Sequence, residues 1–241
     1  MIRLPAATTR YVDTMSRMGF FQNWQAESME RLSAGTKLVT VNKNERLAHK
    51  GENLEQLYVL VSGLVRLFIP LPNDMERVVA LVGPGESLGE ACLVLNEACP
   101  YHAVAGRDSH LLAIDAHLFR RELTRDQSIA QQTMEIIARR LMDNLRDTEI
   151  CAQRSSVQRV ACFLMQQQPE KDMISYKFSL PARKQDIAAK LGLTQETFSR
   201  MLGFLQKQGL IQVDGAHILV ENGLKLAQIS TLRETKEPCQ P

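Results

Sequence analysis

The sequence predicts an α+β protein built from an N-terminal antiparallel β-roll, one long helix and a C-terminal winged helix-turn-helix. Three observations lead to this fold class. Short apolar runs separated by turn residues fill the stretch from 36 to 114. A stripe of apolar residues at helical spacing follows, from about 126 to 149. Nearer the C-terminus, a glycine stands between two short helical segments, and a hairpin pattern comes after them.

The β-roll is expected in residues 36–114. Its strand candidates are KLVTV, LYVLV, LVRLFI, VVALV and LLAI, and turn residues separate them at Gly51, Gly63, 72–74, 83–85 and Gly106. Short strands at such spacing are typical of a small antiparallel barrel or roll. Apolar positions at helical spacing between 12 and 33 predict short helices that lead into it. We therefore assign 1–125 to a first domain.

The long helix is expected over 126–152. Its apolar stripe recurs at three- and four-residue steps and consists of Met134, Ile137, Leu141 and Leu145. Such a helix could pack on the roll, or it could pair with its copy in a second subunit as a short coiled coil. The stripe alone favours neither arrangement.

The C-terminal segment 153–241 carries the helix-turn-helix. The run RKQDIAAKL predicts a first helix, Gly192 the turn, and Thr194 the cap of a second helix that reaches about 208. In the second helix the inward positions are Phe198, Met201, Leu202 and Leu205, which leaves Gln195, Glu196, Ser199 and Arg200 outward near its N-terminus. Strand runs on either side of Asp214-Gly215 predict the hairpin of a wing.

These outward side chains suit the major groove of double-stranded DNA. An arginine can donate two hydrogen bonds to guanine, a glutamate can accept from cytosine, and a serine serves base or phosphate. Three lysines, Lys184, Lys190 and Lys207, flank the helix and could contact phosphates. Helix–glycine–helix segments also occur in proteins that never meet DNA. We predict that Thr194, Gln195, Glu196, Ser199, Arg200 and Lys184 form the DNA-binding surface.

Charge and cysteine usage agree with a DNA-binding protein inside the cell. The net charge is +2, but the part from Arg154 onward has 12 Lys and Arg against 8 Asp and Glu, and so carries about +4. The five cysteines, Cys92, Cys99, Cys151, Cys162 and Cys239, contain no C-x-x-C pair, which argues against a disulfide framework or a zinc ribbon. No window approaches about 18 apolar residues, and the N-terminus lacks the apolar core of a secretory signal, so we expect a cytoplasmic protein without a membrane partner.

No catalytic constellation stands out. A nucleophile elbow, a P-loop and an H-E-x-x-H motif are all missing from the sequence, so we expect no enzyme. A regulatory roll that acts on an enzyme or channel without touching DNA is the other class considered, and the outward residues of the second helix argue against it. The polar stretch 233–241 predicts a disordered tail.

The run DIAAKLGLTQETFSRMLGFLQKQGLIQVDG resembles the C-terminal domain of the CRP/FNR family of transcription regulators, in particular its FNR branch. The pattern that carries the likeness is E-x-x-S-R, matched by Glu196, Ser199 and Arg200. The resemblance extends over nearly the whole chain, with a cyclic-nucleotide-binding-like roll first. It implies a homodimer joined along the long helix, an FNR-like palindrome with half-sites close to TTGAT, and RNA polymerase as a further partner.

The resemblance also implies an effector site between the roll and the long helix. We expect Gly89, Glu90, Cys92, Tyr101 and His102 to form it. Cyclic AMP is not expected, because Tyr101-His102 replace the Arg-Ser pair with which family members hold the cyclic phosphate. An iron–sulfur cluster is not expected either. No cysteine precedes Cys92, and Leu112 occupies the position of the internal ligand.

Two effector chemistries stay open. The stretch GEACLVLNEACPYHAVA resembles the Dnr-type nitric-oxide regulators, which implies haem, with His102 as the first candidate for an axial ligand and His49, His110 and His117 as weaker ones. Alternatively, Cys92 and Cys99 lie on either side of a turn and could act as a thiol switch. Two packed thiols without a role are the plain alternative. In either case, the effector is expected to shift the long helices and thereby the two recognition helices.

Overall fold

The computed structural model describes residues 9–72, 75–170 and 173–231, and the chain divides into two compact units. The N-terminal unit spans Met1–Asn144 and the C-terminal unit Leu145–Pro241, so that the boundary falls within one long helix. The turn expected at 73–74 and the tail expected at 233–241 lie outside the described residues.

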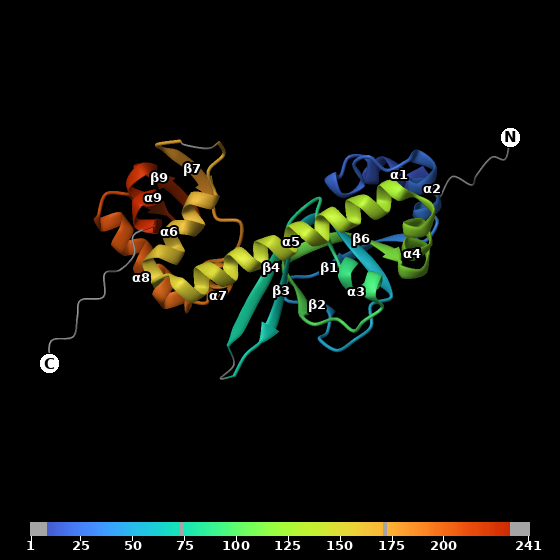
Figure 1. Cartoon of the computed structure of the whole chain (residues 1–241), viewed down its shortest axis with the longest axis horizontal. Helices are drawn as coiled ribbons and strands as arrows, with labels where there is room; N and C mark the ends of the chain where they lie inside the picture. Colours follow the sequence, from blue (N-terminus) through green and yellow to red (C-terminus); the bar gives the residue numbers. More distant parts are fainter. Residues whose placement is uncertain (1–8, 73–74, 171–172, 232–241) are drawn as a thin grey trace. The chain divides into compact units, whose positions relative to one another are not determined.

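The N-terminal unit contains the predicted antiparallel roll (Figure 1). Its main strand order is β1-β6-β3-β4, while β2 pairs with β6 and β5 with β3, and all pairs are antiparallel. The strands are β1 (Thr36–Val41), β2 (Arg46–Ala48), β3 (Gln56–Pro70), β4 (Glu76–Val82), β5 (Ser87–Leu88) and β6 (His102–Asp115).

Two glycines that were expected to separate strands lie inside them instead. Gly63 is within β3 and Gly106 within β6, so these strands are longer than predicted. Gly63 has a φ of 107°, and a Cβ there would stand 2.6 Å from the Cα of Ser109 on the paired strand. The pairing register of β3 and β6 shifts around this point. Glycine is therefore needed for a bulge with close backbone approach, and not for a turn.

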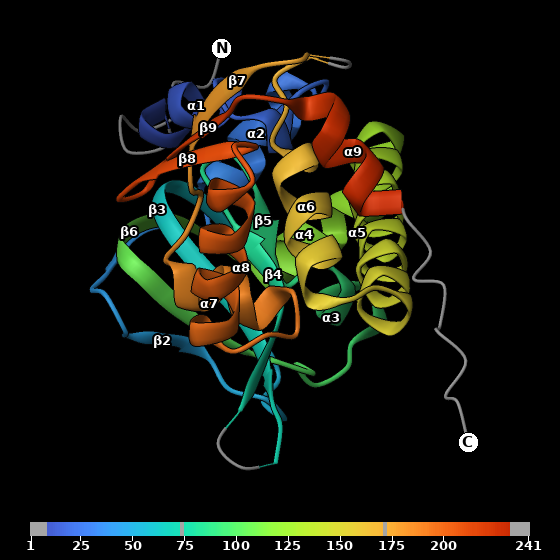
Figure 2. The ribbon, with the colours of Figure 1, turned by 90° about the vertical axis from the view of Figure 1, so that its left-hand side faces the viewer.

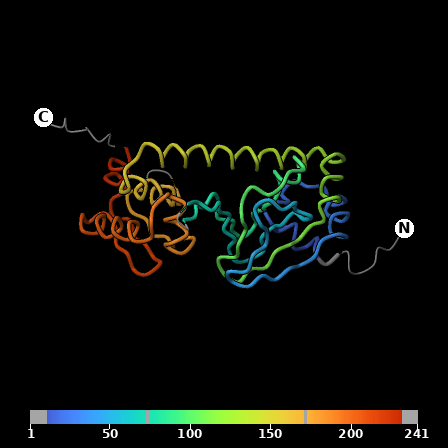
Figure 3. Tube along the Cα trace, turned by 90° about the horizontal axis from the view of Figure 1, so that it is seen from below, coloured from blue at the N-terminus to red at the C-terminus, as the bar shows by residue number. Residues whose placement is uncertain are grey.

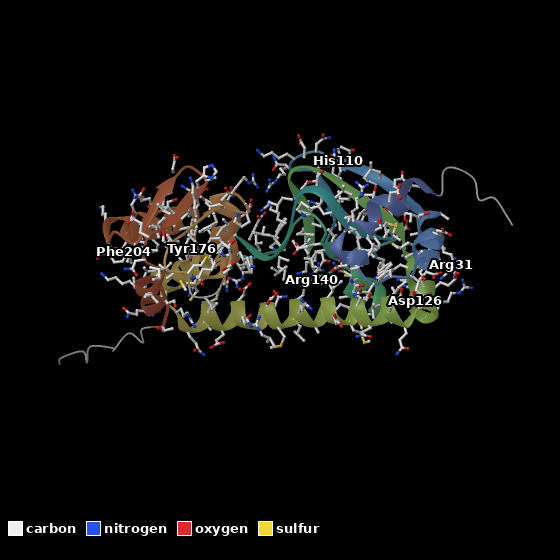
Figure 4. All side chains as sticks on the ribbon, turned by 90° about the horizontal axis from the view of Figure 1, so that it is seen from above. Arg31, His110, Asp126, Arg140, Tyr176 and Phe204 are labelled. Carbon is white, nitrogen blue, oxygen red and sulfur yellow. The ribbon has the colours of Figure 1, made fainter. Side chains whose placement is uncertain are left out.

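Helices close one end of the roll. They are α1 (Thr9–Ser16), the 3₁₀ turn η1 (Gly19–Phe21), α2 (Ala26–Ser33), α3 (Glu90–Leu95) and α4 (Ala116–Arg125). Buried polar contacts tie α2 to the region of α4 and α5: Arg31 Nε donates to Glu122 Oε2 over 2.9 Å, and Ser28 Oγ donates to Asp126 Oδ2 over 2.7 Å. Figure 4 labels Arg31 and Asp126 at this end of the unit.

The long helix α5 (Gln127–Gln153) starts in the N-terminal unit and packs there with one face only. Ile129 and Thr133 are buried, whereas Met134 and Leu141 are 63% and 58% exposed. Figure 3 shows the first part of α5 along one side of the roll. No described helix is both long and apolar enough to cross a membrane.

The C-terminal unit is a winged helix-turn-helix with its own apolar core (Figure 2). Its elements are α6 (Ser156–Gln166), β7 (Tyr176–Ser179), α7 (Lys184–Lys190), α8 (Gln195–Lys207), β8 (Ile211–Asp214), β9 (His217–Val220) and α9 (Gly223–Thr231). The hairpin turn is centred on Gly215-Ala216, one residue later than predicted, because Asp214 pairs with His217. Strand β7 joins this hairpin in the order β7-β9-β8, and α9 packs on α6; neither element was predicted.

Candidate DNA interface and sensor site

The turn between α7 and α8 has the geometry that the sequence predicts. Gly192 adopts a φ of 65°, a conformation that glycine reaches without strain. Thr194 caps α8, because its Oγ1 accepts a hydrogen bond from the Thr197 amide over 3.2 Å. On α7, the buried carboxylate of Asp186 accepts a hydrogen bond from Arg183 Nε over 2.9 Å, which fixes the start of that helix.

The two faces of α8 differ sharply. Phe198, Leu202 and Leu205 are buried in the core of the C-terminal unit. The side chains on the opposite face, near the N-terminus of α8, are exposed; they are Gln195, Glu196, Ser199 and Arg200. None of them has a side-chain hydrogen bond or ion pair with another described residue. Their polar atoms are therefore available to a ligand along one turn and a half of helix.

One further exposed residue lies on this helix. Phe204 follows Arg200 by four residues, one helical turn, and is 45% exposed (Figure 4). An exposed ring next to a polar recognition surface can contact the thymine methyl group or a sugar. The apolar pattern of α8 did not single it out, because a phenylalanine within a helical stripe is usually part of a core.

The flanking lysines differ in their availability. Lys207 is exposed and Lys184 is half-buried. Lys190, in contrast, forms an ion pair with Asp147, with Nζ 3.5 Å from Oδ2. Of the three lysines, Lys190 is therefore the least suited to a phosphate contact.

Arg159 is a residue that the sequence analysis missed. Its guanidinium donates to the carbonyl oxygens of Leu191 over 3.3 Å and Gly192 over 3.4 Å in the α7–α8 turn, and to that of Cys151 over 2.5 Å near the end of α5. The Cys151 thiol also donates to the Leu191 carbonyl over 3.5 Å. These contacts tie the last turn of α5 to the helix-turn-helix.

In the N-terminal unit, the expected effector residues centre on Glu90. Gly89, with a φ of 102°, precedes α3, and Glu90 opens that helix with only 1% of its surface exposed. Arg140 of α5 points towards the roll (Figure 4) and donates from Nη1 to Glu90 Oε2 over 2.7 Å and from Nη2 to the Ser87 carbonyl. Burial raises the pKa of Glu90 above its ordinary value, and the charge of Arg140 opposes this only in part.

Cys92 and Cys99 lie next to this ion pair, together with Tyr101. Both thiols are buried, hydrogen-bonded to each other and free of a disulfide. The Cys99 thiol also contacts the Tyr101 carbonyl oxygen at 3.1 Å. The hydrogen bond from Cys92 lowers the pKa of Cys99 to about 7 and raises that of Cys92. Burial raises the pKa of Tyr101, with smaller contributions from the two sulfurs and Glu90.

His102, which was expected in the same pocket, lies elsewhere. Its ring centroid is 5.3 Å from that of Phe68 and 5.8 Å from that of His49, and the Lys50 amide donates to its Nδ1 over 3.2 Å. Tyr101 precedes β6 and packs on the core of the roll, whereas His102, the first residue of β6, does not belong to that core. The pKa of His102 is lowered, first by burial and then by Arg46 nearby.

Other ring nitrogens have local partners. His49 Nδ1 lies 2.9 Å from Arg46 Nη1, and His110 Nδ1 lies 3.1 Å from Thr40 Oγ1. In the described part of the chain, no three His, Cys, Asp or Glu side chains gather in a group that could hold a metal ion.

Two pockets border the Glu90 region. One of about 630 Å³ lies between α5 and the β4–β5 turn, and Ser87, Arg139 and Arg140 are among its lining residues. The other, of about 460 Å³, lies beside α3 and α4, with Cys92 and Arg120 in its wall. Glu90 Oε1 and Ser87 Oγ are buried without a hydrogen-bond partner among the described atoms.

Comparison with known proteins matches both units to families. Residues 38–126 match the cyclic nucleotide-binding domain, and residues 158–229 match the Crp-like helix-turn-helix domain. The chain is 25% identical over 193 residues to the fumarate and nitrate reduction regulatory protein of Escherichia coli. The aligned residues cover 79% of this chain and 77% of that protein. The chain belongs to the CRP/FNR family. It is therefore a DNA-binding transcription regulator.

Other CRP/FNR relatives cover similar shares. The cyclic AMP receptor protein of Thermus thermophilus is 29% identical over 182 residues, 76% of this chain and 82% of that protein. FixK2 of Bradyrhizobium japonicum shares the fold with a TM-score of 0.70 at 23% identity, over 82% of this chain and 98% of that one. The wing, α7 and α8 all lie within the matched helix-turn-helix domain.

Proposed function

We propose that this CRP/FNR regulator binds a palindromic operator with half-sites close to TTGAT by inserting α8 into the major groove. The observation that carries the proposal is the exposed set Gln195, Glu196, Ser199 and Arg200, whose side chains have no described partner in the protein. Arg200 suits guanine, and Glu196 suits cytosine N4. Thr194 and Lys184 are assigned to the DNA backbone.

The operator would be bound by a homodimer joined along α5. Support comes from the apolar stripe of this helix, in which Met134, Leu141 and Leu145 are exposed and Ile137 is half-buried. An unpaired stripe of this kind is the pattern that a coiled-coil seam needs. Two-fold symmetry then matches a palindrome whose half-sites are one helical turn, about 34 Å, apart. RNA polymerase is the proposed protein partner of the bound dimer.

The signal would enter at the Glu90–Arg140 contact and shift the position of α5. An effector can act there only by binding one arrangement of α5 more tightly than the other. The carboxylate of Glu90 pairs with Arg140 of the same chain, and Tyr101 and His102 supply no cation for a cyclic phosphate. This supports a signal other than cyclic AMP. The absence of a cysteine before Cys92 supports one other than an iron–sulfur cluster.

One candidate signal is nitric oxide sensed through haem at His102. It is suggested by the resemblance of residues 89–105 to Dnr-type regulators. An imidazole that binds iron through Nε2 normally carries its proton on Nδ1. Here Nδ1 accepts from the Lys50 amide, so this hydrogen bond would have to break first. The residues of this region therefore suit a thiol switch at Cys92 and Cys99 better than they suit haem binding at His102.

Arg200→Ala tests the recognition helix. We expect the free energy of binding to a TTGAT palindrome to weaken by roughly 1–3 kcal/mol and base preference to relax at one position. The control is Gln206→Ala, which changes an exposed residue near the other end of α8. Equilibrium titration of labelled operators at fixed salt concentration measures the affinity of both variants. Unchanged affinity of Arg200→Ala would refute the role of α8.

Titration of the reduced protein with haemin, followed by nitric oxide, tests haem-based sensing of nitric oxide. A sharp Soret band at one haem per subunit that is lost in His102→Ala would support haem sensing, with His217→Ala in the wing as the control. If no stoichiometric band forms, haem sensing is excluded.

A further inference from the structure

Cys92 and Cys99 are two buried cysteines that interact with each other. They come from different elements, since Cys92 lies on α3 and Cys99 follows that helix by four residues. Both belong to the same buried cluster of the roll, and a hydrogen bond joins the two thiols. Two neighbouring thiols in one buried cluster are the starting arrangement that a disulfide requires.

The backbone holds these two cysteines unequally. The amide of Cys99 donates to the Glu52 carbonyl and its carbonyl accepts from the Gly51 amide, each over 2.8 Å. Cys99 is thus fixed to the body of the roll at both sides. Cys92 lies in the six-residue helix α3, whose C-cap Asn96 has a φ of 55°. A bond between the sulfurs would therefore move α3 more than it moves Cys99.

The pair borders a pocket through Cys92, which is buried but lines its wall, whereas Cys99 lies behind it. Cys92 lines the pocket of about 460 Å³ together with Asn53, Leu54 and Glu97. The Cys92 thiol lowers the pKa of Cys99, which favours the thiolate at Cys99. A thiolate is the form that attacks an oxidant.

We propose that Cys92 and Cys99 form a peroxide-responsive redox site whose oxidation releases α5 from the roll. The thiolate of the pair attacks a hydroperoxide, the O–O bond breaks, and one oxygen leaves as water or alcohol while the cysteine becomes a sulfenic acid. The second thiol then attacks the sulfenic sulfur, a disulfide forms and a second water leaves. Two thiols lose two electrons and two protons, and the peroxide gains them.

The short helix α3 connects this chemistry to α5. Glu90, two residues before Cys92, holds Arg140 of α5 through the 2.7 Å ion pair. At its other end, α3 is held by Arg120 of α4, whose Nε donates to the Leu93 carbonyl over 2.8 Å. A pull on Cys92 towards Cys99 therefore shifts Glu90 against Arg140. The proposal rests on the proposed function only for the last step, from α5 to DNA.

The first measurement is made on the full-length protein treated with hydrogen peroxide. Trypsin cuts after Arg77 and Arg107, so both cysteines fall in one peptide, and the disulfide appears as a loss of two hydrogens from it. We expect this loss in the wild type and in the control Cys162→Ser, which changes a buried cysteine elsewhere. It should be absent in Cys92→Ser and Cys99→Ser. Persistence of two free thiols at 92 and 99, or sulfonic acid alone, would overturn the proposal.

The second measurement follows α5 by amide hydrogen exchange over residues 127–144. Oxidation should increase exchange around Arg140 in the wild type and leave Cys92→Ser unchanged. Glu90→Gln, which weakens the ion pair, should raise exchange there without oxidant. Formation of the disulfide with unchanged exchange in α5 would refute the coupling.

Operator titration separates this proposal from the proposed function. We expect oxidation to change operator affinity by about tenfold in the wild type and Cys162→Ser, and not in Cys99→Ser. If the reduced protein fails to bind the operator, the proposed function fails, while the mass and exchange measurements still decide the redox site. If the reduced protein binds and a fully formed disulfide leaves affinity unchanged, the redox control is wrong.

Discussion

At the scale of single residues, Glu90 is a buried carboxyl group whose charge is costly in the N-terminal unit. It is 1% exposed and has one ionic partner, Arg140, whose side chain is 31% exposed. Burial disfavours its charged form, and the partner compensates only partly, since its pKa remains raised. Breaking this contact would leave the Glu90 charge buried without a partner, so an effector that separates the pair has to compensate that charge.

Glu90→Gln should change the pH dependence of stability. Because the folded-state pKa of Glu90 is raised, its stabilising contribution is complete below the ordinary value of 4.5 and is lost as the pH rises from there through the folded-state pKa. The free energy of unfolding of the wild type should therefore fall relative to that of Glu90→Gln over this range. Urea unfolding at a series of pH values measures the difference. The exposed Glu97→Gln serves as control, and parallel pH curves for wild type and Glu90→Gln would contradict the argument.

At the scale of elements, α5 has two different faces. Ile129 and Thr133 pack on the N-terminal unit, whereas the stripe from Met134 to Leu145 is exposed. Exposed apolar side chains in a row are unfavourable in water, and a second copy would cover them. Arg140 shares this helix with the stripe, so a shift that releases Arg140 also changes the geometry of the seam.

Leu141→Glu should dissociate the proposed dimer. A charge placed in an apolar seam without a partner costs on the order of 3 kcal/mol per buried group, which weakens dimerisation by at least about a hundredfold. Analytical ultracentrifugation over a concentration series measures the dissociation constant. Arg139→Glu, on another face of the same helix, should leave it unchanged. A wild-type protein that sediments as a monomer at all concentrations would show that α5 is not a seam.

At the scale of the whole molecule, the two units have separate cores. The C-terminal core gathers around Phe198, Ile187 and Leu164, while Trp24 lies in a core of the N-terminal unit. Trp24 is the single tryptophan of the chain, so its fluorescence reports on one unit alone. Separate cores allow one unit to lose stability while the other keeps it.

Phe198→Ala should unfold the C-terminal unit first. Removing a fully buried ring costs about 3–5 kcal/mol, through lost burial and the cavity that remains. Far-ultraviolet circular dichroism should show an early transition in urea, while the fluorescence transition of Trp24 stays in place. Phe204→Ala, on the exposed side of the same helix, should change stability by less than about 0.5 kcal/mol. A coincident shift of both signals in Phe198→Ala would mean that the units unfold together.

The sequence by itself determined the fold class, the long helix and the turn around Gly192. These depend on local periodicity and on residues with special backbone conformations, which neighbours along the chain establish. The outward positions of Gln195, Glu196, Ser199 and Arg200 follow from the same helical period. The turn at Gly215 was misplaced by one residue because register depends on the paired strand.

Only the tertiary structure decided which distant residues meet. The Glu90–Arg140 ion pair joins residues 50 positions apart, and Arg159 reaches the α7–α8 turn from another helix. Gly63 was taken as a turn because the sequence does not reveal that Ser109 approaches it. Likewise, Tyr101 and His102 are neighbours in the chain, but Tyr101 packs on the core of the roll and His102 lies against Phe68. Tertiary packing separates them, and no local pattern encodes which of the two faces the effector site.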